Sequence, residues 1–425
     1  MNTRWLAATG CLVGALALGV GACGDDDDGG GGGGGGGETE AKALTVYSSL
    51  PLQGASRPQT TAMVNGIKLA LEQADNKAGD FTIKYESLDD STAQAGSWTP
   101  EATQANASKA AQDDSTAVYI GEFNSGASAI SIPVLNEAGV PQISPANTAV
   151  GLTSDEPGAN PGEPDKYYPA QAEFGRTYTR IVPKDTIQGA ALATVMKEDG
   201  CTAVQLTNDK EVYGAGLGRN IESSAEAQGL KIVSNEAIDK NAPNYRSLAS
   251  KAKGAGADCF IYSGITANNA VQLYKDFSAA LPDAKLYGPD GVAESGFADP
   301  KEGGIPADVA AKMKVTVATL SPDEYPAEGQ DFFTQFSEKY GEPNPDPYAI
   351  YGYEAMRLAL DAIERSGTGE KADIIKALFD TTDRESVLGT YSIDENGDTT
   401  LTDYGVYTID GGELTFDSTI KAETG

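Results

Sequence analysis

Small hydroxyl residues follow two short apolar stretches of the sequence, and both groups have the chemistry to hold an anion. Residues 125–128 (Ser-Gly-Ala-Ser) come soon after the stretch at 117–120, and residues 144–148 (Ser-Pro-Ala-Asn-Thr) close the stretch at 140–144. If both stretches are parallel strands, these residues lie at their carboxyl ends, where open α/β sheets bind ligands. The N–H groups and hydroxyls of a first helical turn at 125–128 would suit an anion. Taken alone, each group is more simply explained as a capped helix start.

Three other segments match cofactor or metal loops only in part. At 213–219 the last glycine of a dinucleotide-binding pattern would fall on Arg219, and the glycines at 366–371 have no strand before them. The acidic segment that begins at Asp394 has Thr399 and Gly405 where a calcium loop needs glycine and glutamate. We therefore predict neither a cofactor nor a metal.

Catalysis is disfavoured by what the composition lacks. The chain has no histidine, which removes the commonest general base, and it has only four cysteines. No credible nucleophile–base pair remains, so we predict a binding protein rather than an enzyme. The formal net charge of −31 also disfavours nucleic acid and anionic lipid as partners.

Alternating apolar strands and amphipathic helices must position these residues. Two series of this kind predict an α/β fold with two doubly wound parallel-sheet lobes. A third block, with a strand at 315–320 and helices at 331–340 and 348–365, completes one of the lobes, and a Pro/Gly-rich stretch at 154–169 is predicted to be a surface loop. The predicted strands are 44–47, 82–88, 117–120 and 140–144 in the first series and 203–207, 231–237, 259–262 and 284–287 in the second.

The first 42 residues carry export signals rather than a fold. Residues 1–22 have one charge and a short apolar stretch, and they end in Val20-Gly21-Ala22 before Cys23, which resembles the lipobox of bacterial lipoproteins. We predict a lipoprotein signal at 1–22, lipidation at Cys23 and an Asp/Gly-rich tether at 23–42. The alternative is an ordinary secretory signal in which Cys23 is incidental.

Several segments, in consistent order from about residue 44 to 415, resemble the leucine/isoleucine/valine-binding proteins, a family of type I periplasmic solute-binding proteins. The resemblance implies two lobes, joined by a three-segment hinge, that close on a ligand. Lobe 1 is expected at 43–180 plus 318–400, and lobe 2 at 181–317 plus 401–425. The matching segments are 120–125, 136–145, 208–214, 288–292 and 347–355.

The same resemblance implies the ligand contacts. Ser125 and Thr148 would bind a ligand carboxylate, with a backbone contact at Ala146. Asp290 would hold the α-ammonium, and Tyr213 would form part of the cleft wall. This sequence departs from the family's pattern in two places, since Ile265 stands where the branched-chain binders have an aromatic residue and Asp290 is one methylene shorter than their glutamate.

The implied function is that of a substrate-binding lipoprotein of an ABC importer. It would be anchored by lipid at the outer face of the cytoplasmic membrane, capture an amino acid or similar solute as a monomer, and deliver it to a permease. The alternative is an extracellular sensing domain for a small amide or carboxylate.

Two cysteines remain in the folded body, Cys201 and Cys259. They lie at the beginning of the first and third strands of lobe 2, which are neighbours if the strand order is 2-1-3. Neighbouring strands bring Cα atoms within bridging distance, and an extracytoplasmic compartment is oxidising. A disulfide and a pair of small buried thiols both remain possible interpretations.

Overall fold

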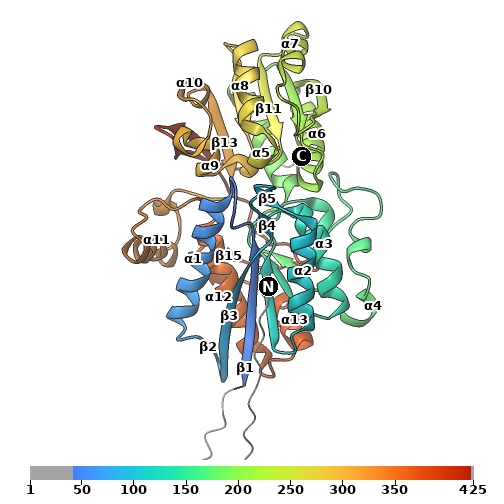
Figure 1. Ribbon diagram of the computed structural model, residues 1–425, viewed down its shortest axis with the longest axis vertical. Coiled ribbons are helices and arrows are strands. Elements are labelled where there is room, and N and C mark those ends of the chain that lie inside the picture. Colours follow the sequence, from blue (N-terminus) through green and yellow to red (C-terminus); the bar gives the residue numbers. More distant parts are fainter. Residues whose placement is uncertain (1–41, 423–425) are drawn as a thin grey trace, which may run out of the picture. The chain divides into compact units, whose positions relative to one another are not determined.

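Two α/β sheets organise residues 42–422, the part of the chain that the computed structural model describes. The predicted lipidation site Cys23 lies outside these residues, as do the signal and all but the last residue of the tether. Within the described part, no helix is both long enough and apolar enough to cross a membrane. Figure 1 shows lobe 1 in the lower half of the picture and lobe 2 in the upper half.

The sheet of lobe 1 has six strands, four of which run parallel to β1. Short β2 is antiparallel and closes one edge. Helix α1 packs against α12, and α2 packs against α3. In order across the sheet the strands are β2 (Lys77–Ala78), β3 (Phe81–Asp89), β1 (Ala43–Leu50), β6 (Thr116–Gly121), β7 (Gln142–Ser144) and β8 (Tyr178–Arg180), and the helices are α1 (Arg57–Gln73), α2 (Pro100–Gln112), α3 (Ser125–Glu137), α12 (Ala349–Ser366) and α13 (Lys371–Phe379).

The sheet of lobe 2 has seven strands and begins with the predicted 2-1-3 order. Five strands are parallel, and a C-terminal hairpin adds two antiparallel strands at one edge. The sequence analysis did not predict this hairpin. In order the strands are β10 (Lys231–Ala237), β9 (Ala203–Asn208), β11 (Cys259–Ser263), β12 (Lys285–Gly288), β13 (Met313–Val317), β16 (Tyr404–Asp410) and β17 (Glu413–Ile420), and the helices are α5 (Asp185–Glu198), α6 (Val212–Ala227), α7 (Arg246–Gly254) and α8 (Ala270–Ala280).

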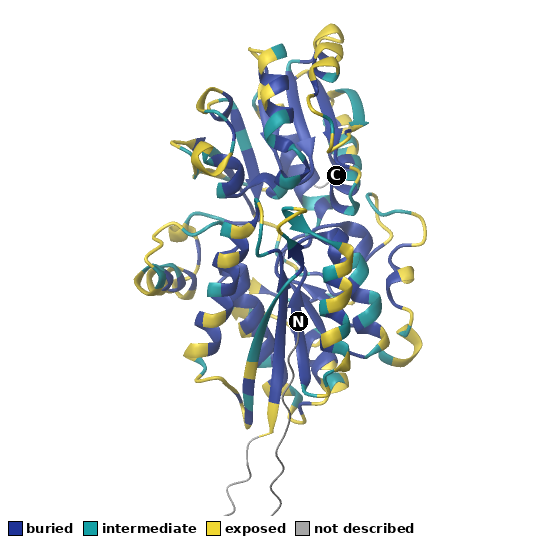
Figure 2. Ribbon diagram, viewed as in Figure 1, coloured by how far each residue is buried: buried dark blue, intermediate teal, exposed yellow. Residues whose placement is uncertain are grey.

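Shorter elements decorate both lobes. Hairpins are formed by β4 (Ser91–Thr92) with β5 (Ser97–Trp98) and by β14 (Arg384–Ser386) with β15 (Gly389–Tyr391). The remaining helices are α4 (Gln171–Phe174), α9 (Ser295–Ala298), α10 (Ala307–Ala310) and α11 (Ala327–Tyr340). Figure 2 shows that the central strands are buried in both lobes while the outer faces of the helices are exposed.

Three chain segments cross between the lobes, and side chains tie them together. Arg180 at the end of β8 pairs with Asp398 at 2.6 Å, and both are buried. Burial opposes ionisation of Asp398, but the charges of Arg180 and Lys184 hold the pKa of this carboxyl below its ordinary value. The Tyr404 hydroxyl donates to the Pro183 carbonyl. These bonds join the first and third crossings, and a hydrogen bond of 2.9 Å between the Thr319 and Tyr407 hydroxyls joins the second crossing to the strand that follows the third.

The predicted surface loop at 154–169 is only partly exposed, so that prediction was wrong in part. Tyr167 and Tyr168 are buried and pack in a small cluster with Ile132 and Leu152. Arg219 of helix α6 donates hydrogen bonds to the carbonyl of Gly158 and to Asn160. The loop is thus anchored in lobe 1 and reaches lobe 2.

Cys201 and Cys259 are joined in a disulfide, with their Cα atoms 5.9 Å apart. Cys259 is the first residue of β11, and Cys201 lies just before its neighbour β9. Neighbouring strands produce this separation, which falls within the usual range for disulfides. The bridge therefore links two neighbouring parallel strands of lobe 2, β9 and β11.

Candidate functional site

One cavity lies where the two lobes meet, and all six residues predicted to bind a ligand line it. Ser125, Ala146 and Thr148 belong to lobe 1, whereas Tyr213, Ile265 and Asp290 belong to lobe 2. The free space is small, since the centre of a water molecule can occupy only about 20 Å³ of it. An amino acid needs more room than one water molecule. The lobes must therefore separate to admit a ligand.

The wall from lobe 1 is built around the start of helix α3. The N–H groups of Ser125 and Gly126 lie in its first turn, where no intrahelical acceptor exists, and no other described residue accepts from them. The Ser125 hydroxyl accepts from the Ala149 N–H at 3.3 Å, which leaves its own proton available. Such a cluster of donors at a helix N-terminus suits a carboxylate.

Buried side chains hold this wall in place. The amide of Asn147 donates to the carbonyls of Glu122 (3.0 Å) and Phe123 (2.9 Å), and it accepts from the Tyr178 hydroxyl at 3.1 Å. The Ser144 hydroxyl also donates to the Glu122 carbonyl. These bonds fix the turn between β6 and α3, so the N–H groups of α3 keep their direction.

Thr148 presents a buried hydroxyl with no hydrogen-bond partner among the described residues. The nearby Asp185 carboxyl is also buried, and burial raises its pKa well above the ordinary value. The Thr148 hydroxyl opposes this rise in the pKa, although no hydrogen bond of ordinary length joins the two groups. Thr148 is therefore free to bind a ligand atom in the cavity.

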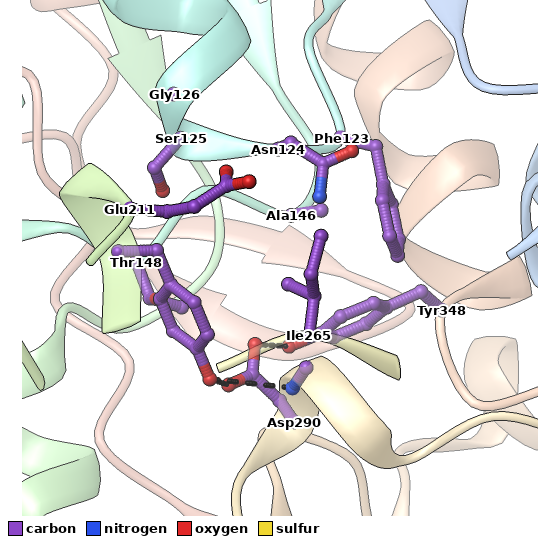
Figure 3. Close-up of a pocket in the computed structure, with 12 residues that line it drawn as sticks. Phe123, Asn124, Ser125, Gly126, Ala146, Thr148, Glu211, Ile265, Asp290 and Tyr348 are labelled. Atoms are coloured by element: carbon purple, nitrogen blue, oxygen red, sulfur yellow. Dashed lines mark hydrogen bonds between the residues drawn. The ribbon is translucent and has the colours of Figure 1, made fainter. Parts of the chain in front are cut away.

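Asp290 supplies the central acidic group of the lobe 2 wall. It begins a 3-10 turn (Asp290–Val292) directly after strand β12 and Pro289. Its two carboxylate oxygens accept from the Tyr213 hydroxyl at 2.5 Å and from the Tyr348 hydroxyl at 2.9 Å, as Figure 3 shows. Burial raises the pKa of the Asp290 carboxyl, while the two tyrosine hydrogen bonds favour its ionised form. Each oxygen can still accept another hydrogen bond.

Tyr348 comes from lobe 1, so its bond to Asp290 crosses the cleft. The sequence analysis quoted this residue as part of a matching segment but did not place it in the site. Its ring packs edge-on to Phe123, another lining residue, with the centroids 6.4 Å apart. The same hydrogen bond holds the lobes together and orients the acidic group.

The sequence analysis also missed Glu211 and Asn124. Glu211 precedes α6, and Figure 3 shows its carboxylate directed into the cavity between Ser125 and Asn124. Asn124 is buried, and its side-chain oxygen has no partner among the described residues. The only sequence signal for Glu211 was its position two residues before Tyr213. Whether its side chain points into the cavity depends on the contact between the lobes.

Lobe 1 therefore presents hydrogen-bond donors that suit a ligand carboxylate, and lobe 2 presents acidic side chains that suit a ligand cation. A family model described as periplasmic binding protein matches residues 48–413 of this chain. The chain belongs to that family. Its fold is that of the type I periplasmic binding proteins, and proteins of this family bind solutes outside the cytoplasm without catalysing a reaction.

Among curated relatives of this binding protein is the leucine-, isoleucine-, valine-, threonine-, and alanine-binding protein of Pseudomonas aeruginosa. It is 25% identical over 350 residues, which cover 80% of this chain and 83% of the relative. The Leu/Ile/Val-binding protein homolog 1 of Brucella abortus is 24% identical over 302 residues, covering 70% of this chain and 73% of the relative.

Solved structures share the binding-protein fold. The leucine binding protein LivK of Thermotoga maritima superposes with a TM-score of 0.76 at 21% identity, covering 89% of this chain and 99% of the other. A solute binding protein of an ABC transporter from Rhodopseudomonas palustris, in complex with p-hydroxybenzoic acid, gives 0.73 at 17% identity, covering 90% and 98%. One fold therefore carries ligands of different chemistry, and the lining residues must decide among them.

Proposed function

We propose that this protein is the substrate-binding lipoprotein of an ABC importer and captures an amino acid or a close analogue between its lobes. One observation carries the proposal. The same cavity has free N–H and hydroxyl donors at the start of α3 on one side and the Asp290 carboxyl on the other. An amino acid has the two charged groups that match these walls.

In this proposal the ligand carboxylate binds at Ser125 and Thr148, and its ammonium binds at Asp290. The ligand contacts both lobes at once, so it stabilises the closed form over the open one. The hydrogen bond from Tyr348 to Asp290 already joins the lobes in the closed form. The ligand would add its own contacts to this bond. A permease would recognise this closed form.

An aromatic carboxylate is the second candidate, because the structural neighbour from Rhodopseudomonas palustris binds one. Phe123, Tyr213 and Tyr348 would offer it ring contacts. Such a ligand has no cationic group for Asp290 or Glu211, and no lysine or arginine among residues 42–422 lines the cavity. Desolvated carboxylates without a cation are costly, so the amino acid is the better match.

Calorimetric titration with amino acids, benzoates and simple amides tests the ligand class. The protein is first partly unfolded and dialysed to remove co-purified solute, and native mass spectrometry of untreated protein checks which solute was carried. We expect at least one amino acid to bind and 4-hydroxybenzoate not to bind. Saturable binding of the benzoate alone would replace the amino-acid proposal with the second candidate.

The lipid anchor is tested separately. A diacylated Cys23 would give stable attachment, since each buried methylene contributes about 0.8 kcal/mol. We expect Cys23→Ser to release the protein from the membrane fraction, whereas Cys11→Ser, within the signal, should leave it attached. A wild type without lipid, found free in the medium, would contradict the anchor.

Loss of transport on deletion of a neighbouring permease gene would separate import from sensing.

A further inference from the structure

Glu211 supplies a second carboxylate at the cavity, on the side where the ligand carboxylate is expected. A Cβ built on Gly126, in the first turn of α3, would lie 3.4 Å from Glu211 Oε2. Figure 3 shows Glu211 beside Ser125 and well separated from Asp290. The two acidic groups of lobe 2 therefore reach different parts of the same cavity.

Only one oxygen of Glu211 is occupied by protein. Its Oε1 accepts from the Asn268 amide at 2.9 Å, and Lys240 approaches the same atom at 3.7 Å from a half-exposed position. No hydrogen bond from the described residues reaches Oε2. The free oxygen is the one that lies toward α3 and the cavity.

Other groups in the cavity also favour a cation. The Asn124 side-chain oxygen is buried without a partner among the described residues and can accept from an ammonium. Phe123 and Tyr348 present aromatic rings, whose faces attract ammonium and guanidinium groups. Two carboxylates and no basic side chain line the cavity.

A neutral zwitterion leaves one of these acidic groups without a cationic partner in the ligand. Its carboxylate is neutralised by the donors of α3 and its ammonium by Asp290, so Glu211 Oε2 gains no cation from the ligand, while the half-exposed Lys240 lies 3.7 Å from the other oxygen, Oε1. A carboxylate oxygen that loses water without gaining a hydrogen-bond donor is unfavourable. A ligand with a second positive group removes this cost.

Resting on the proposed function, we infer that the ligand is a diamino or guanidino acid with a net positive charge, such as lysine, ornithine or arginine. Its carboxylate binds at the start of α3. One of its two cationic groups binds Asp290, and the other binds Glu211. Glu211 is then the residue that selects basic amino acids over neutral ones.

A ligand pair that differs in one group tests this inference. Lysine and 6-hydroxynorleucine have the same carbon chain, but a hydroxyl replaces the side-chain ammonium in the second. Both are titrated calorimetrically, together with leucine, into wild type, Glu211→Gln and Glu226→Gln. Glu226 is an exposed residue of the same helix, so its substitution removes the same charge away from the cavity.

We expect the wild type and Glu226→Gln to bind lysine at least about 10-fold more tightly than 6-hydroxynorleucine, because a lost charge pair typically costs that much or more. In Glu211→Gln the two affinities should agree within about threefold. Equal binding of both ligands by the wild type, or an unchanged ratio in Glu211→Gln, overturns the inference but leaves the proposed function standing. If no amino acid of any charge binds, the proposed function itself is wrong.

Discussion

The two walls of the cavity are built from different chemistry. Lobe 1 offers backbone N–H groups and small hydroxyls at the start of α3, and buried Asn147 and Ser144 hold them in position. Lobe 2 offers acidic and bulky side chains, among them Glu211, Ile265 and Asp290. Backbone N–H donors are present in any sequence that forms the turn, whereas a single substitution changes a side chain.

This difference separates general binding of a ligand from selection among ligands. In the proposed function, the lobe 1 wall binds the carboxylate that all amino acids share, and its donors are immobilised before any ligand arrives. The lobe 2 wall decides which solutes fit the rest of the cavity. We therefore expect substitutions behind the lobe 1 wall to affect stability and all ligands alike, and substitutions in the lobe 2 wall to affect particular ligands.

Asp290→Asn should have the largest effect on binding. The substitution removes the charge that faces the ligand ammonium, and loss of one partner from a buried charge pair costs about 2–5 kcal/mol, or roughly 30- to 5,000-fold in affinity. Calorimetric titration with the best amino acid measures this loss. Asp283→Asn, at an exposed position nearby, is the control. If Asp290→Asn binds as tightly as the wild type, Asp290 is not the ammonium site.

Asn147→Ala should destabilise the lobe 1 wall without removing any of its hydrogen-bond donors. It leaves the Phe123 carbonyl and the Tyr178 hydroxyl without these buried partners, whereas the Glu122 carbonyl keeps the Ser144 hydroxyl. Each unsatisfied buried group costs about 1–3 kcal/mol, so we expect the free energy of unfolding to fall by about 2–4 kcal/mol. Urea denaturation measures the change.

Ser144→Ala is the comparison for Asn147→Ala. It removes the hydrogen bond donated to the Glu122 carbonyl and two that the hydroxyl accepts from the Ala146 and Asn147 N–H groups. It should cost about 1–3 kcal/mol. In both variants, affinities for different amino acids should fall by similar factors. A selective loss for one side chain would place specificity in lobe 1.

Glu294→Gln tests the contact between the lobes through pH. This buried carboxyl lies near Ser56 of lobe 1 and Thr266 of lobe 2, and burial raises its pKa to about 7. The folded protein keeps a proton that the unfolded chain releases, so the free energy of unfolding should fall as pH rises from about 4.5 through about 7. The shift corresponds to up to about 3 kcal/mol.

The variant should lose that part of the pH dependence. Urea denaturation at several pH values compares it with Glu338→Gln, an exposed control. Identical pH profiles for Glu294→Gln and the wild type would show that the proton is held elsewhere, for example at Glu122, whose pKa burial also raises to about 7.

Ile265→Val should have the smallest effect. Ile265 is buried at the cavity wall, and removing one methylene costs about 0.5–1.5 kcal/mol in such positions. Affinity should change by roughly 10-fold at most, with larger side chains gaining relative to smaller ones. Competition between leucine and phenylalanine for the same protein measures the ranking. If the relative affinities of leucine and phenylalanine do not change, Ile265 does not determine which side chains the cavity accepts.

Local patterns predicted the elements that position the site. The strand expected at 117–120 is β6 (Thr116–Gly121), and the helix expected at 348–365 is α12 (Ala349–Ser366). The strand is a continuous, fully buried stretch, and the helix has apolar residues along its full length. The six predicted cavity residues also meet, because the carboxyl ends of parallel strands lie at one edge of each sheet.

Features that depend on contacts between distant segments escaped prediction. Tyr167 and Tyr168 lie in a stretch rich in proline and glycine, and their burial depends on Ile132 and Leu152. The direction of Glu211 depends on Asn268 and on how α3 approaches it from the other lobe. No local pattern contains such information.

The three crossings of the chain between the lobes also set the order in which the protein can fold. Helix α12 packs against α1 and touches β6, although the five parallel strands of the second sheet, β9 to β13, separate them in the sequence. A chain emerging from the ribosome therefore exposes part of the first sheet until residue 366 has been made. Contacts of such long range slow folding. That delay would help to keep the chain unfolded during export, and a fragment ending at residue 180 should not fold alone.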